Sequence, residues 1–234
     1  MAKKHELRQQ HAGMILNFTS KKQETTVAKA LKSALERLKA SFPVGFDHKP
    51  IWLLTEIVEK LHDDFPDVPF ATPRARSSMR PDGGIVSIVD TGANEHPILI
   101  VEVKNQGTND ARVAEGLTTQ AMGNAIERLG KNVIGFRTAM LTEGIMPFLC
   151  FGYGYDFKGG SSILDRVSTI AMFGHLNEVN VVPLGDAAQF ARGSYFFREQ
   201  EWSADEMANI MVDVASRSIH FYFAKYGEHV FRAE

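Results

Sequence analysis

The sequence predicts a single α/β domain in which a central mixed β-sheet is flanked by helices. Short apolar segments typical of strands are interspersed along the chain with segments of helical periodicity. The length of 234 residues fits one compact domain, and no repeat or low-complexity linker divides it. We therefore expect one domain over residues 1–234.

Composition excludes several classes of protein. A single cysteine, Cys150, excludes a disulfide framework and a thiolate zinc cage, and the eight histidines lack the spacing of a zinc site. No apolar run approaches the ~18 residues of a membrane span, and the N-terminus lacks the apolar core of a signal peptide. We expect a cytoplasmic protein with no membrane partner.

Charge is distributed unevenly. The net charge is −2, but residues 1–40 carry +6 and the remainder −8. A basic N-terminal segment over about 1–40 indicates either an arm or helix for a polyanion or a solvated basic helix face. Charge alone leaves both interpretations open.

The first half of the chain predicts two helices and then two strands. Apolar residues at helical spacing predict a helix through 27–38 and a second helix that begins after Pro50. Residues 63–83 have the composition of a loop. Two strands follow, joined by a turn, over 85–89 and 98–104.

The second half alternates helices and strands. A helical region covers about 110–142, and Ser203 to Glu206 form a capping box that opens a helix to about 224. The remaining elements are a strand over 148–153, a helix over 162–173, and strands over 179–183 and 194–197. This order predicts the mixed sheet.

Two charges interrupt the strand over 98–104. Its alternation puts Ile98, Ile100, Glu102 and Lys104 on one face. Burial of the two charges is costly unless they are paired or bind a metal. A hairpin would bring Asp82, which precedes two glycines and is separated from Glu102 by 19 residues, near that carboxylate.

This trio predicts phosphodiester hydrolysis. Asp82 and Glu102 offer the hard oxygen ligands that Mg²⁺ prefers, and the ion can activate water for attack on phosphorus. Lys104 can orient that water or stabilise the developing negative charge. Gly83 and Gly84 let the backbone pass close to a ligand. The alternative is an ordinary Glu102–Lys104 ion pair on the surface of an edge strand.

A second polar group lies at a predicted helix start. Asn124 begins a helix whose buried side is apolar, which leaves Glu127 and Arg128 near its N-terminal end. These three residue types can hydrogen-bond to base edges in the major groove. The alternative is an N-cap asparagine followed by a surface Glu–Arg pair.

Three segments resemble the EcoRI-type restriction endonucleases in order and spacing: residues 80–86, 101–107 and 123–128. The resemblance implies a restriction-endonuclease-like fold and a homodimer that cuts palindromic duplex DNA with Mg²⁺. It also implies 5′-phosphates, AATT overhangs and a cognate DNA methyltransferase as functional partner.

The resemblance also implies roles for single residues. Asp82, Glu102 and Val103 match metal-binding positions, and Lys104 matches the catalytic lysine. The positions that match readers of the AATT centre are Asn124, Ala125, Glu127 and Arg128. The positions that match contacts to the DNA backbone are Ser77, Ser78, Arg80, Lys131 and Asn132.

The chain departs from the family at positions linked to the outer base pair. Arg166 is kept, but Thr169 stands where the family has a second arginine, and Gln120 stands in place of a methionine. The predicted site is therefore GAATTC or the relaxed RAATTY. A repair or junction nuclease with the same core, or a catalytically inactive DNA-binding protein, remains an alternative.

Overall fold

The structure is a computed structural model that describes residues 2–105, 109, 113–118, 124–182 and 190–232. The side chains of residues 2–21, 105, 124 and 125 lie outside this description. Within the described residues, no helix is both long enough and apolar enough to cross a membrane.

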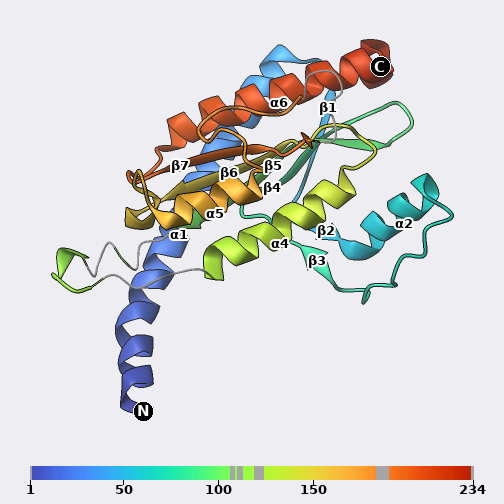
Figure 1. The fold of residues 1–234 in the computed structure, drawn as a ribbon. Coiled ribbons are helices and arrows are strands. Elements are labelled where there is room, and N and C mark those ends of the chain that lie inside the picture. Colours follow the sequence, from blue (N-terminus) through green and yellow to red (C-terminus); the bar gives the residue numbers. More distant parts are fainter. Residues whose placement is uncertain (1, 106–108, 110–112, 119–123, 183–189, 233–234) are drawn as a thin grey trace.

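A five-stranded mixed sheet forms the centre of the fold, in the order β1-β4-β5-β6-β7 (Figure 1). The first three strands pair antiparallel, whereas β5, β6 and β7 are parallel. The sheet strands are β1 (Gly45–Lys49), β4 (Gly84–Val89), β5 (Glu95–Asn105), β6 (Phe148–Tyr153) and β7 (Ser194–Arg198). A separate two-stranded sheet pairs β2 (Trp52–Leu53) with β3 (Ser78–Met79).

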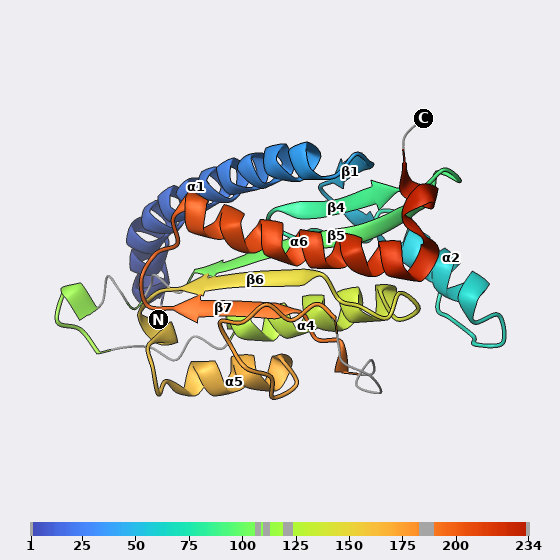
Figure 2. The same cartoon turned by 90° about the horizontal axis from the view of Figure 1, so that it is seen from above.

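Helices cover both faces of the large sheet, so the fold has three layers (Figure 2). One face carries α1 (Ala2–Ser41) and α6 (Ala204–Tyr226), and the other carries α4 (Asn124–Ala139) and α5 (Ser162–Ile170). The remaining helices are α2 (Leu54–Asp64), η1 (Tyr155–Phe157) and η3 (Glu228–Phe231). The predicted α/β class and mixed sheet are confirmed.

The connections between the parallel strands decide which helix ends meet at one edge of the sheet. Helix α4 joins β5 to β6, and α5 joins β6 to β7. A crossover helix runs antiparallel to the strands that it connects. The N-terminal ends of α4 and α5 therefore lie at the edge where β5 and β6 end.

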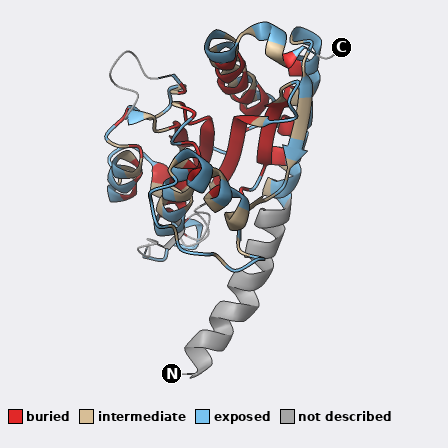
Figure 3. Ribbon diagram, turned by 90° about the vertical axis from the view of Figure 1, so that its right-hand side faces the viewer, coloured by how far each residue is buried: buried red, intermediate tan, exposed pale blue. Residues whose placement is uncertain are grey.

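Strands β4, β5, β6 and β7 are mostly buried and form the centre of the core (Figure 3). Two apolar clusters lie on opposite faces of the sheet. One includes Val101 and Val103 with α1 and α6, and the other includes Ile100 and Cys150 with α4 and α5. The expectation that Cys150 belongs to the core is confirmed.

A β-bulge corrects the predicted face of Ile98. Val86 pairs with Leu99 but Ser87 pairs with Pro97, so Ile98 is the extra residue on β5. Ile98 consequently packs with Leu99 on the α1/α6 face. The strict alternation holds only from Leu99 onward.

The strand predicted over 179–183 is wrong for its described part. Residues 179–182 form no strand, and residue 183 lies outside the described residues. The Asn180 N–H donates to Ser194 Oγ at 2.8 Å, so a side-chain hydrogen bond replaces a ladder of backbone pairs. Val181 is buried in the core, which explains the apolar pattern.

Several boundaries differ from the predicted ones. Strand β1 was not predicted, because its five residues include Asp47, His48 and Lys49 and are all exposed or half-buried. Residues 52–53 and 78–79 form the small sheet rather than a helix start and a loop. Helix α5 ends at Ile170 rather than 173, where Met172 and Phe173 take positive φ angles.

Candidate active site

The β4–β5 hairpin brings the two predicted carboxylates together. The Val103 N–H donates to Asp82 Oδ2 at 2.9 Å, and the Asp82 N–H donates to Glu102 Oε2 at 3.3 Å. The Gly83 N–H donates to the Val101 carbonyl at 2.9 Å, which aligns the turn with β5. The predicted proximity of Asp82 to Glu102 is therefore confirmed.

The two glycines make this turn possible through close packing rather than room for a ligand. A Cβ on Gly83 would lie 2.7 Å from the Val101 Cβ, so a side chain would push the turn away from β5. Gly84 has φ +75°, a left-handed conformation that favours glycine. His48 Nε2 lies 3.0 Å from the Gly83 carbonyl oxygen and supports the same turn from β1.

On the central strand, Glu102 is buried and Lys104 is half-buried. The exposed fractions of their side chains are 3% and 17%, and Lys104 Nζ contacts Glu102 Oε1. Strand β5 is flanked by β4 and β6. A surface ion pair on an edge strand is therefore wrong for these residues.

Helix α4 contributes a third hydrogen bond to the same carboxylate. Asn132 Nδ2 donates to Glu102 Oε1 at 3.2 Å. The sequence placed Asn132 only among contacts to the DNA backbone, because nothing in its spacing indicates that α4 packs over this point of β5. The structure thus joins Asp82, Glu102, Lys104 and Asn132 in one cluster.

The charge of this cluster is unbalanced. Burial raises the pKa of Glu102 and the neighbouring Asp82 raises it further, against the lowering effect of Lys104. Burial lowers the pKa of Lys104, but its neighbours, with Glu102 first among them, together raise it above its usual value. Two carboxylates face one ammonium group, and a divalent cation would offset the excess negative charge.

The donor set fits Mg²⁺. Within the described residues, no three His, Cys, Asp or Glu side chains gather as a metal cage. The ion commonly binds through one or two carboxylates and completes its shell with water and phosphate oxygens. Of the two carboxylates, Glu102 is buried and Asp82 is exposed, so a bound ion could reach solvent and phosphate oxygens on the Asp82 side.

The N-terminal ends of α4 and α5 lie at the sheet edge where this cluster is located. Glu127 and Arg128 are exposed in the first turns of α4, which begins at Asn124 as predicted. Arg166 is exposed in the second turn of α5. Exposed polar residues in the first two turns of α4 and α5 therefore lie toward the edge of the sheet where β5 and β6 end.

Thr169 lies one turn beyond Arg166 and is exposed. Its hydroxyl donates to the Asp165 carbonyl in the same helix at 3.0 Å. This bond occupies the hydroxyl hydrogen, so Thr169 presents an acceptor oxygen and a methyl group to the surface.

The other predicted DNA contacts lie near the small sheet and on α4. Ser78, Arg80 and Lys131 are exposed, and Ser77 is half-buried. Gln120 lies outside the described residues, and only the backbone of Asn124 and Ala125 is described.

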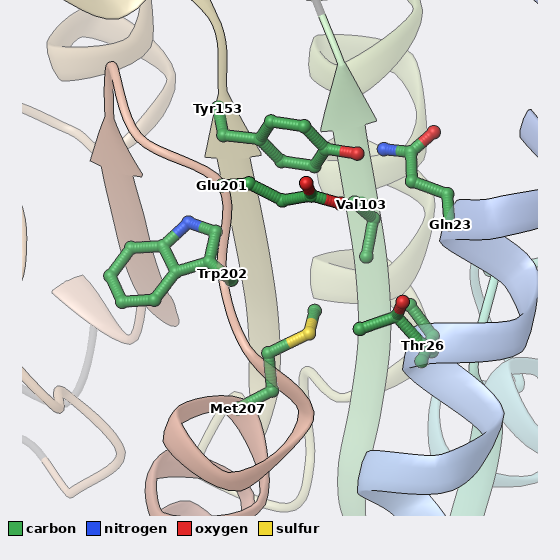
Figure 4. A pocket seen from close by; sticks show the side chains of 8 residues that line it. Gln23, Thr26, Val103, Tyr153, Glu201, Trp202 and Met207 are labelled. Carbon is green, nitrogen blue, oxygen red and sulfur yellow. The ribbon is translucent and has the colours of Figure 1, made fainter. Parts of the chain in front are cut away.

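A small cavity lies behind the cluster, on the other face of β5 (Figure 4). It is lined by Val103 of β5, Gln23 and Thr26 of α1, and the segment that enters α6. Trp202 Nε1 donates to the Gly152 carbonyl at 3.0 Å and fixes that segment to β6. Its lining includes one carboxylate and no cation, so it does not offer a second catalytic centre.

Comparison with known proteins agrees with this geometry. The chain is 28% identical to the type II restriction enzyme RsrI of Cereibacter sphaeroides over 88% of this chain and 86% of that protein. It is 26% identical to the type II restriction enzyme EcoRI of Escherichia coli over 94% of this chain and 92% of that protein. The family profile described as "Restriction endonuclease EcoRI" matches residues 9–162. The chain therefore belongs to the EcoRI family of type II restriction endonucleases.

Proposed function

We propose that this enzyme is an Mg²⁺-dependent homodimer that cuts both strands of duplex DNA at a palindrome with an AATT core. One observation carries the proposal: the Asp82–Glu102–Lys104 cluster opens at the sheet edge where α4 and α5 begin. Cleavage then leaves 5′-phosphates and AATT overhangs. A cognate methyltransferase protects the host DNA, and the enzyme acts in the cytoplasm.

Each residue of the cluster has a distinct task in hydrolysis. Asp82, Glu102 and the main-chain carbonyl of Val103 would hold Mg²⁺, which would supply a Lewis acid at the scissile phosphate. Lys104 is fixed by Glu102 with its ammonium group beside the carboxylate pair. Its charge stabilises the negative charge that develops on a non-bridging phosphate oxygen, and its hydrogens orient the attacking water.

Sequence reading is assigned to the beginning of α4. Asn124, Ala125, Glu127 and Arg128 contact base edges of AATT, because amide, carboxylate and guanidinium groups match adenine and its neighbours in the major groove. Ser77, Ser78, Arg80 and Lys131 contact phosphates. Such contacts position the duplex without reading its sequence.

A two-fold dimer matches a palindromic target. Ile134 on α4 is 69% exposed, and Phe173 after α5 is 84% exposed. Apolar side chains exposed beside the reading helices support a second copy of this chain as the occupant of that surface.

The outer base pair is read less strictly than the core. Arg166 can donate to guanine, but Thr169 replaces the family's second arginine and its hydroxyl hydrogen is bound within α5. A bidentate arginine contributes ~1–3 kcal/mol of discrimination. With one arginine the enzyme should cut RAATTY-type sites alongside GAATTC.

Digestion of plasmid DNA with Mg²⁺, followed by sequencing of the ends, tests the proposal. Discrete fragments with AATT overhangs are expected. Nicks at junctions or damaged sites would instead indicate a repair nuclease, and intact DNA would indicate an inactive binding protein. Either result would contradict the proposal.

Matched oligonucleotides with GAATTC, AAATTT and CAATTG test the outer base. We expect AAATTT to be cut within about a thousandfold of GAATTC, which corresponds to about 4 kcal/mol. A larger preference would mean that another donor replaces the missing arginine and that the site is strictly GAATTC.

A further inference from the structure

We propose that Asn132 is a positioning residue for the cleavage reaction, one that orients the Glu102 carboxylate from helix α4. The inference rests on the proposed function and goes beyond it, because it assigns to Asn132 a task inside the protein rather than at the DNA backbone. Its basis is the 3.2 Å hydrogen bond from Asn132 Nδ2 to Glu102 Oε1.

The two oxygens of Glu102 have different partners. Oε1 accepts from Lys104 Nζ and from Asn132 Nδ2, whereas Oε2 accepts from the Asp82 N–H. The carboxylate plane is therefore fixed by groups from three segments of the chain. Lys104 is on the same strand as Glu102, whereas Asn132 ties Oε1 to α4 and the Asp82 N–H ties Oε2 to the turn before β4.

Burial makes this third donor important. The Glu102 side chain is only 3% exposed, so water cannot readily replace a lost hydrogen bond. Without the amide, Oε1 would be held by Lys104 alone, and only the 3.3 Å bond from the Asp82 N–H to Oε2 would still tie the carboxylate to another segment. Groups that orient metal ligands typically change metal affinity or activity by 10–100-fold when they are removed.

The position of Asn132 on α4 links it to the reading residues. It lies one helical turn after Arg128, so the two side chains share a face of the helix. A movement of α4 along its axis when Arg128 engages DNA would carry the Asn132 amide with it. The orientation of Glu102 thus depends on where the reading helix lies.

The packing of α4 on the other side of the site limits such movement. Gly135 of α4 lies so close to Met79 of β3 that an added Cβ would clash with the Met79 sulfur. Met79 precedes Arg80 and the turn that carries Asp82. Helix α4 therefore contacts β5 at Glu102 through Asn132, and contacts the segment before Asp82 through Gly135.

Three variants test the proposal. Asn132→Ala removes the hydrogen-bond donor, and Asn132→Asp keeps the size of the side chain but replaces the amide with a carboxylate that cannot donate. Thr138→Ala is the control. Thr138 lies on the exposed side of the same helix, and its hydroxyl donates to the Ile134 carbonyl. All three are first checked for wild-type circular dichroism. The two readouts are the Ca²⁺ dependence of DNA affinity and the single-turnover cleavage rate.

For Asn132→Ala we expect a metal-free DNA affinity within about threefold of wild type and a roughly tenfold higher Ca²⁺ midpoint. The single-turnover rate at a fixed low Mg²⁺ concentration should fall about 10–100-fold. Asn132→Asp should lose at least as much rate, because its carboxylate repels Glu102. Thr138→Ala should match wild type in every measurement.

Two results would overturn the proposal. A wild-type rate and Ca²⁺ midpoint in Asn132→Ala would mean that the amide does not orient Glu102. A tenfold loss of metal-free DNA affinity with an unchanged Ca²⁺ midpoint would make Asn132 a phosphate contact instead. If wild type and Thr138→Ala themselves fail to cut at discrete sites, the proposed function fails, while the Ca²⁺ midpoints still report on Asn132.

Discussion

Two buried carboxylates lie near opposite ends of β5, and their surroundings differ in a way that separates stability from function. Glu102 is on β5 near its C-terminal end, and Glu143 lies beside His96 near the start of the same strand. Their side chains are 3% and 6% exposed. Burial is nearly equal, so their different pKa directions come from their neighbours.

Glu143 is surrounded by donors and cations. Lys60 Nζ lies 2.6 Å from it and Lys225 Nζ 3.8 Å, the Tyr226 hydroxyl donates at 3.3 Å, and His96 Nδ1 lies 3.9 Å away. Burial alone would raise the pKa of Glu143, but its neighbours His96 and Lys60 lower it to about 2. This carboxylate binds α2 and α6 to the loop before β6.

Glu102 has the opposite environment. Burial and Asp82 raise its pKa, although Lys104 opposes them. One end of β5 therefore holds a carboxylate whose charge stabilises the fold, and the other holds a carboxylate whose charge is costly until a cation binds. Such costly groups are typical of functional sites.

Substitutions at the two ends of β5 should differ most in their effect on the rate of DNA cleavage. Asp82→Ala, Glu102→Ala or Lys104→Ala should each lower the single-turnover rate by at least about a thousandfold, or about 4 kcal/mol. Glu143→Gln should cut at the wild-type rate at a temperature where it is folded. Cleavage by Glu102→Ala at the wild-type rate would contradict the assignment.

The next largest effect is on stability. Glu143→Gln should lower the free energy of unfolding at pH 7 by roughly 3 kcal/mol, because the folded protein favours the charged form. Since its folded pKa of about 2 is below 4.5, this contribution is complete above pH 4.5 and is lost as the pH falls toward 2. Urea unfolding of both proteins between pH 7 and pH 3 measures it. A difference that does not shrink with falling pH would be contrary to this account.

Divalent cations should stabilise the protein through the Glu102 end of β5 alone. Ca²⁺ at about ten times its Kd should stabilise the wild-type protein by about 1.4 kcal/mol, and removal with EDTA should reverse the effect. Glu143→Gln should keep this shift and Glu102→Gln should lose it. Thermal unfolding with and without Ca²⁺ is the measurement, and an equal shift in both variants would place the cation elsewhere.

The smallest expected effects lie outside both clusters, at exposed cations. Arg80→Ala or Lys131→Ala should weaken binding to all DNA sequences alike and reduce the salt dependence of log K by about one unit. Titrations at several salt concentrations with cognate and scrambled duplexes measure it. A change confined to cognate DNA would assign the residue to base reading.

The hairpin and its charged trio could be predicted because they depend on local sequence. Alternation on β5, the Gly83–Gly84 turn and the spacing from Asp82 to Glu102 act within about twenty residues. The α6 capping box is equally local, and its Ser203–Glu206 pair forms as predicted. In this hairpin the β-bulge at Ile98 was not predicted, because an uninterrupted run of apolar residues does not show where an extra residue is inserted.

The contacts that could not be predicted join distant segments. Asn132 reaches Glu102 across 30 residues, His48 reaches Gly83 across 35, and Glu143 reaches Lys60 across 83. Each contact depends on how one helix or strand packs against another. The sequence pattern of a single element does not predict that packing. Strand β1 was missed for a related reason, since its pairing with β4 compensates for its polar composition.

The free energy of unfolding of Glu102→Gln without metal at pH 7 distinguishes a carboxylate whose charge stabilises the fold from one whose charge is costly. We expect a smaller loss than for Glu143→Gln, because the substitution takes a partner from Lys104 but also removes a buried charge that faces Asp82. Urea unfolding of wild type, Glu102→Gln and Glu143→Gln in EDTA gives the comparison. A loss for Glu102→Gln as large as that for Glu143→Gln would mean that both carboxylates stabilise the fold, and the contrast between the two ends of β5 would be wrong.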